Sequence, residues 1–71
     1  MLSARNQIPA QIVSITLGTI MAEIIMVDAS GMKLVSVITK QSAVALGLKE
    51  GMRVKAIIKA TEVMIDTDQK G

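Results

Sequence analysis

Three short stretches of this chain carry side chains that could bind an anion. The first is Ser3-Ala4-Arg5, where a hydroxyl and a guanidinium stand two residues apart, followed by the amides of Asn6 and Gln7. Hydroxyl and guanidinium groups donate hydrogen bonds to oxyanions, and the guanidinium adds a full positive charge. A frayed terminus beside a solvated strand edge is the structural alternative to this interpretation.

The second stretch, Thr39-Lys40-Gln41-Ser42, stands at the predicted start of a short helix. The start of a helix presents unpaired N–H groups and a positive dipole end, and two hydroxyls there can donate to an oxyanion. Thr39 as N-cap and Ser42 at the third helical position also fit ordinary capping, which the pattern alone favours. We expect Lys40 and Gln41 to face solvent.

The third stretch is Lys59-Ala60-Thr61, at the end of a predicted strand. Because Lys59 would share a strand face with Arg53 and Lys55, the pattern alone favours a solvated basic stripe. Three such stretches in one chain favour an anion site over a solvated basic stripe, since the chain has few other side chains that could do chemistry. Together they predict a site for a tetrahedral dianion.

Other kinds of chemistry find little support in the sequence. The chain has no His and no Cys, which excludes imidazole and thiolate metal sites and the corresponding nucleophiles or bases. Its carboxylates do not form a convincing acid–base pair, and the six Met residues lack ligand spacing. We therefore predict a protein that is not an enzyme and that has neither a metal site nor a catalytic cofactor.

The elements that must position these residues are mostly strands. Val and Ile arrive in short bursts separated by Gly or small polar residues, which is typical of β-structure. The pattern predicts strands over 7–17, 20–28, 32–38, 53–60 and 62–65, and a helix over 40–46. Pro9 should keep the start of the first strand at an edge or outside the ladder. Five strands with one helix between the third and fourth predict an all-β, five-stranded oligonucleotide/oligosaccharide-binding (OB)-like barrel.

Composition bounds the size of the protein and its partners. The 71 residues suffice for one domain over 1–71, with a polar tail at 66–71. Hydrophobic residues make up 51% of the chain without one aromatic, and the second strand is apolar on both faces, which predicts a homo-oligomer. The net charge of +2 and the missing aromatics argue against nucleic acid, and no apolar run is long enough for a membrane helix. We expect a cytoplasmic protein.

Two parts of the chain resemble a known family: SARNQ at 3–7 and VITKQSAVALGLKEGMRVKAIIKATEVMI at 37–65. They are similar to the molybdenum-pterin-binding or Mop family, which includes the molbindins and the molybdate-binding domains of transporter ATPases and molybdate-responsive regulators. The resemblance implies an OB-like barrel that binds molybdate or tungstate at subunit interfaces and assembles as a hexamer, a trimer of dimers. It also implies anion contacts from Ser3, Ala4, Arg5, Thr39, Ser42, Lys59 and Ala60.

The resemblance has departures and leaves alternatives. Pro9 and Ala10 replace residues that are often non-Pro and Gly in the family, so the entry into the first strand should be stiffer. Without an aromatic residue to stack a pterin ring, we expect the bare oxyanion as ligand. Storage of molybdate is the predicted function. The alternatives are a nucleic-acid-binding small barrel and a regulatory module that reports anion occupancy to a partner.

Overall fold

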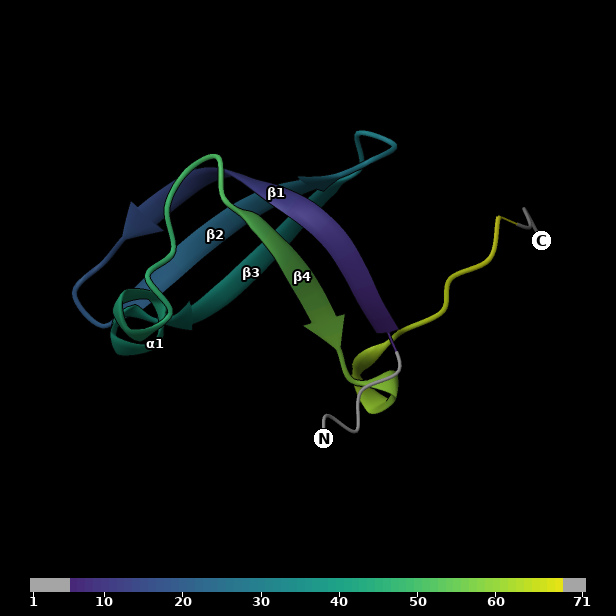
Figure 1. Ribbon diagram of the computed structural model, residues 1–71. Helices are drawn as coiled ribbons and strands as arrows, with labels where there is room; N and C mark the ends of the chain where they lie inside the picture. Colours follow the sequence, from purple (N-terminus) through teal and green to yellow (C-terminus); the bar gives the residue numbers. More distant parts are fainter. Residues whose placement is uncertain (1–5, 69–71) are drawn as a thin grey trace.

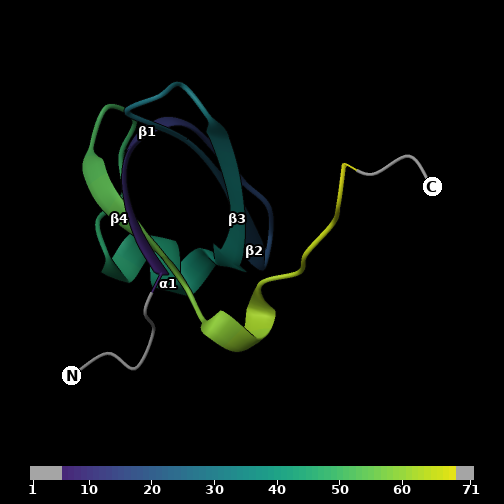
Figure 2. The ribbon, with the colours of Figure 1, turned by 90° about the vertical axis from the view of Figure 1, so that its right-hand side faces the viewer.

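The protein folds into one curled antiparallel sheet with a short helix. The computed structural model describes residues 6–68, in which the sheet order is β3-β2-β1-β4. In the view of Figure 2, the strands curl around a common interior, which holds the core side chains. The elements, shown in Figure 1, are β1 (Asn6–Leu17), β2 (Met21–Asp28), β3 (Lys33–Thr39), α1 (Lys40–Ala45), β4 (Arg53–Ile58) and the 3-10 turn η1 (Ala60–Glu62).

The long first strand curls the sheet because its two halves pair with different neighbours. Residues 6–11 pair with β4, and residues 10–17 pair with β2. Pro9 lies opposite Lys55 of β4, whereas the pairing with β2 begins only at Ala10. At Pro9 the strand is therefore paired along one edge and unpaired along the other. A proline has no N–H to donate to a ladder, and such a half-open position tolerates it.

An irregularity at Val13 explains why the first strand alternates only approximately. The register with β2 shifts between Ile12 and Ser14. Before the shift, Ala10 and Ile12 are buried; after it, Ile15 packs against the core, so the inward residues change from even to odd numbers. A bulge of one residue has this effect because side chains alternate strictly along a strand.

The fold class predicted from the sequence is confirmed, but the predicted fifth strand is not present among the described residues. The first three strands form the expected meander, and α1 lies between β3 and β4. The predicted strand over 62–65 is wrong, because residues 60–62 form η1 and residues 63–68 have no regular structure. The fourth strand ends at Ile58 instead of residue 60. Its pairing with β1 extends to Asn6, the first described residue, and the N–H of Glu62 then bonds the carbonyl of Lys59 at 2.9 Å.

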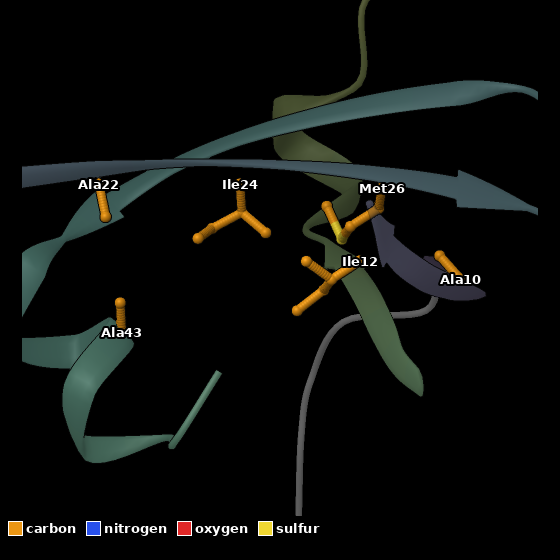
Figure 3. Packing of buried hydrophobic residues seen from close by; sticks show 6 residues of the cluster. All are labelled: Ala10, Ile12, Ala22, Ile24, Met26 and Ala43. Carbon is orange, nitrogen blue, oxygen red and sulfur yellow. The ribbon is translucent and has the colours of Figure 1, made fainter. Parts of the chain in front are cut away.

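The core is small and aliphatic (Figure 3). Ile12 is its largest fully buried side chain, and Ala43 attaches the helix to the sheet. Ala22 of β2 and Ala43 of α1 point toward each other in Figure 3, and their small side chains let the helix pack close to the strand. The buried residues are Ala10, Ile12, Ala22, Ile24, Met26 and Ala43. No helix in residues 6–68 is long and apolar enough to cross a membrane.

The turn between β2 and β3 is organised by Asp28. Its Oδ1 accepts hydrogen bonds from the Ser30 N–H and the Met32 N–H, both at 2.9 Å, and from the Ser30 hydroxyl at 2.7 Å. Gly31 completes the turn with a φ of 88°, which favours glycine. The Ser30 hydroxyl, followed by the Met32 N–H, lowers the pKa of Asp28 below its ordinary value of 3.8, because these donors favour the charged carboxylate.

Asp28→Asn should therefore reduce stability in a pH-dependent way. A lowered folded-state pKa stabilises the fold above the unfolded-state value, and this stabilisation is lost as pH falls through the folded-state pKa. We expect a lower melting temperature than the parent at pH 7 and a difference that shrinks below pH 3.8. Thermal unfolding from pH 7 to pH 2 measures this. Glu50→Gln, at another turn carboxylate, is the control, and a pH-independent difference for Asp28→Asn would contradict the assignment.

Candidate oxyanion-binding site

Thr39 and Ser42 form a hydroxyl pair at the start of α1. Thr39 has extended backbone angles (φ −68°, ψ 147°), and its Oγ1 accepts the Ser42 N–H at 3.1 Å. The Thr39 hydroxyl also donates to Ser42 Oγ at 2.7 Å. This is the expected N-cap. Because Ser42 Oγ acts as the acceptor in this bond, its own proton is free to point outward, and both residues are exposed.

A shallow hollow lies beside this hydroxyl pair, between the helix start and the β1–β2 turn. The N–H of Lys40 donates to the carbonyl of Ile20 at 2.7 Å and ties the two segments together. Lys40 and Gln41 are exposed, as expected. The residues around the hollow are Thr19, Ile20, Thr39, Lys40, Gln41, Val44 and Ala45.

Thr19 is a third hydroxyl residue in this hollow that the sequence did not single out. It stands twenty residues before Thr39 and carries no local motif beyond Gly18-Thr19 at a turn. Its place beside the helix start depends on the β1–β2 hairpin and on pairing of β2 with β3, in which Met21 lies opposite Thr39. Only this long-range pairing brings the two threonines to one hollow.

Lys59 and Ala60 lie where the chain leaves the sheet. Lys59 is extended (φ −63°, ψ 138°) and precedes η1, while Ala60 is its first residue, and both are exposed. The predicted face that Lys59 shares with Arg53 and Lys55 is not formed by one strand, because β4 ends at Ile58. The basic stripe therefore comprises Arg53 and Lys55 on the outer face of β4, and Lys59 belongs to the turn that follows.

A single chain does not bring all the candidate residues together. Figure 1 shows α1 and η1 at opposite ends of the sheet, so the Thr39–Ser42 pair lies far from Lys59. Asn6 pairs with Ile58, and its side-chain Nδ2 donates to the Ile58 carbonyl at 3.3 Å. Ser3, Ala4 and Arg5 lie outside the described residues. Within residues 6–68, the candidate residues form two separate groups, one at α1 and one at η1.

The described residues hold no alternative metal centre. No group of three or more His, Cys, Asp or Glu side chains in residues 6–68 is placed to hold a metal ion. The chemistry at both halves is that of hydrogen-bond donors and a cation: the Ser42 hydroxyl at α1, and the Lys59 ammonium with the backbone at η1. Such donors suit an oxyanion, which accepts hydrogen bonds at every oxygen.

Comparisons with known proteins agree on one relationship. A family model for the TOBE domain matches residues 2–65. Molybdenum-pterin-binding protein 1 of Clostridium pasteurianum is 44% identical over 64 residues, covering 90% of this chain and 94% of that protein. A probable molybdenum-pterin-binding protein of Haemophilus influenzae is 40% identical over 68 residues, covering 94% of this chain and 97% of that protein.

Two solved structures have the same fold as this chain. MopII from Clostridium pasteurianum (apo2) superimposes with a TM-score of 0.89 at 39% identity, covering 94% of this chain and all of that one. A molybdate-binding protein from Sporomusa ovata also superimposes with a TM-score of 0.89, at 40% identity, covering 94% of this chain and 98% of that one. The likeness therefore extends through the whole sheet and the helix.

Proposed function

Because this chain belongs to the TOBE-domain family, and within it to the molybdenum-pterin-binding proteins, we propose that it binds molybdate, with tungstate as an equivalent ligand. The observation that carries the proposal is the exposed Thr39–Ser42 hydroxyl pair, which leaves a proton on Ser42 free to donate. Binding involves no chemical step and no catalytic cofactor.

Two kinds of residue contribute to binding: cations that neutralise the charge of the anion, and hydrogen-bond donors that orient it. Arg5 and Lys59 neutralise the dianion, and the hydroxyls of Ser3 and Ser42 direct hydrogen bonds to its oxygens. Thr39 contributes by donating its own hydroxyl proton to Ser42 Oγ, which leaves the Ser42 proton for the anion. The backbone N–H groups near Ala4 and Ala60 add further donors. Sulfate has the same charge and tetrahedral shape, so selection against it depends on the size of the pocket.

The anion site is shared between subunits of a homo-oligomer, a hexamer built as a trimer of dimers. The separation of α1 from η1 in one chain supports this arrangement, because one subunit can supply the Thr39–Ser42 pair and its neighbour can supply Lys59. The exposed apolar side chains that flank the hollow, Ile20 and Val44, supply surface that a neighbouring subunit can cover.

Storage of molybdate in the cytoplasm completes the proposal. Titration calorimetry of the purified protein with molybdate, tungstate, sulfate and phosphate, together with its native mass, tests it. We expect heat from molybdate and tungstate, weak or no heat from sulfate and phosphate, and a mass several times that of one chain. Equal binding of all four anions would reduce the site to a non-selective basic surface and refute the proposal.

Ser42→Ala should separate capping from anion binding. The variant keeps the Thr39 cap, because the Thr39 oxygen accepts from the Ser42 backbone N–H and not from its side chain. We expect the ligand-free protein to be about as stable as the parent and the affinity for molybdate to fall by about 0.5 to 3 kcal/mol, since a hydrogen bond to a charged acceptor is lost. Melting temperatures with and without saturating molybdate measure both quantities, because a ligand that binds the folded state raises its stability.

Thr39→Ala is the matched comparison for that experiment. It removes the cap and should lower the free energy of unfolding by about 0.5 to 2 kcal/mol even without ligand. An undiminished molybdate-induced shift in Ser42→Ala would remove Ser42 from the site, and an undiminished shift in both variants would assign the pair to capping alone.

A further inference from the structure

A carboxylate lies on the outer face of the sheet, close to the proposed anion site. Glu23 stands in β2 between Ala22 and Ile24, which are 1% and 3% exposed and point into the core (Figure 3). Side chains alternate along a strand, so Glu23 points to the outer face, where it is exposed. It has no part in the proposed anion contacts.

The strand register places Glu23 beside the Thr39–Ser42 hydroxyl pair. Glu23 lies opposite Val37 of β3, and Met21, two residues earlier, lies opposite Thr39. Glu23 and Thr39 are therefore diagonal neighbours on one face, and such residues lie about 7 to 8 Å apart, within reach of long side chains. The Thr39 hydroxyl in turn lies 2.7 Å from Ser42 Oγ. The carboxylate is thus within about 10 Å of the oxygen that is proposed to donate to the anion.

The neighbours of Glu23 on this face do not carry a positive charge. Thr16 of β1 and Val37 of β3 flank it. Lys33 shares the face but pairs with β2 four residues further along, a distance of about 13 Å. Lys40 lies beyond the end of β3 and lines the hollow at the helix start. Among residues 6–68, the negative charge of Glu23 is therefore not offset by an adjacent side chain on its own face.

We propose that Glu23 limits the affinity of the site for dianions, so that bound molybdate is released more readily than the hydrogen-bond donors alone would allow. This inference rests on the proposed function, because it adds a residue that sets the affinity of the same site. Repulsion between a carboxylate and a dianion about 8 to 10 Å away in a solvated setting lowers the affinity by a factor of about 3 to 10 at low ionic strength. A protein that stores an anion must also give it up, and a weaker site does so faster.

Glu23→Gln keeps the size of the side chain and removes its charge. We expect the affinity for molybdate, measured by titration calorimetry at low ionic strength, to rise by a factor of about 3 to 10, and the gain to shrink as salt is added. The control is Glu50→Gln, which removes the same charge at another exposed position, in the loop before β4, and should change the affinity by less than about twofold. An unchanged or reduced affinity for Glu23→Gln would overturn the proposal.

A thiol in place of the Ser42 hydroxyl gives a readout that needs no molybdate. The chain has no Cys, so Ser42→Cys introduces a single thiol, and its thiolate is an anion at the proposed position. We expect the pKa of this thiol to lie about 0.3 to 0.7 lower when Glu23→Gln is added, because a nearby negative charge disfavours the thiolate. The pH dependence of alkylation by iodoacetamide measures the pKa. Adding Glu50→Gln should leave the pKa in place, and an equal pKa with and without Glu23→Gln would contradict the role given to Glu23.

The two measurements distinguish failure of this proposal from failure of the proposed function. A thiol that responds to Glu23→Gln in a protein that does not bind molybdate would support the electrostatic role of Glu23 and refute the assignment of the anion. Molybdate binding that is the same in the parent and in Glu23→Gln, with an unmoved thiol pKa, would refute the role of Glu23 and leave the anion site standing.

Discussion

Lys59→Ala is expected to weaken molybdate binding by about 2 to 5 kcal/mol, because truncating one partner of a desolvated, hydrogen-bonded charge pair costs that much. Lys59 is exposed in a single chain and lies outside regular strand structure, so its removal should leave the fold almost unchanged. The loss should therefore appear in the calorimetric affinity and not in the melting temperature of the ligand-free protein.

Lys55→Ala is the matched control for Lys59→Ala. Lys55 is an exposed lysine on the neighbouring strand β4, opposite Pro9, and has no place in the proposed site. We expect its removal to change the affinity by less than about 1 kcal/mol, as is typical of exposed charges. Equal losses for the two lysines would indicate a diffuse basic surface without a defined pocket. Arg5→Ala should behave like Lys59→Ala, since both cations are proposed to neutralise the same dianion.

Ile12→Ala is expected to cause a large loss of stability, about 2 to 5 kcal/mol of unfolding free energy. Ile12 is 1% exposed and packs at the centre of the sheet. Its backbone also anchors the loop before β4, because its N–H donates to the Met52 carbonyl at 2.9 Å and its carbonyl accepts from the Gly51 N–H at 2.7 Å. The substitution removes the side chain and keeps these backbone bonds, so the effect measures packing alone. Denaturant unfolding is the measurement.

Val13→Ala, one residue further along, is the control for Ile12→Ala. Val13 lies at the bulge and is 47% exposed. We expect the free energy of unfolding to fall by less than about 1 kcal/mol, because the half-exposed Val13 side chain buries less apolar surface than Ile12 does. If Val13→Ala were as damaging as Ile12→Ala, the inward direction assigned to this part of β1 would be wrong.

Local patterns in the sequence were sufficient for most of the sheet and for the helix start. Turns at Gly18 and Gly31 separate three bursts of β-branched residues, and neighbouring strands joined by short turns pair with one another. Thr39 could be identified as the N-cap because capping depends on residues within three positions, and the Thr39–Ser42 bond has that spacing. The candidate anion residues came from donor types and from the family resemblance, which the relatives and the TOBE match confirm as a relationship.

The features that the sequence did not determine are those that depend on distant partners. The bulge at Val13 changes which residues of β1 face the core, and it is a feature of the register between this strand and β2. Thr19 reaches the helix start only through the pairing of three strands. Residues 62–65 have the composition of a strand, yet a strand exists only where an edge pairs with it, and no local signal says which edge that is. Among the described residues this segment pairs with no strand edge, so it has no regular structure. The two groups of candidate residues lie at opposite ends of the sheet because the course of β4 carries Lys59 away from α1.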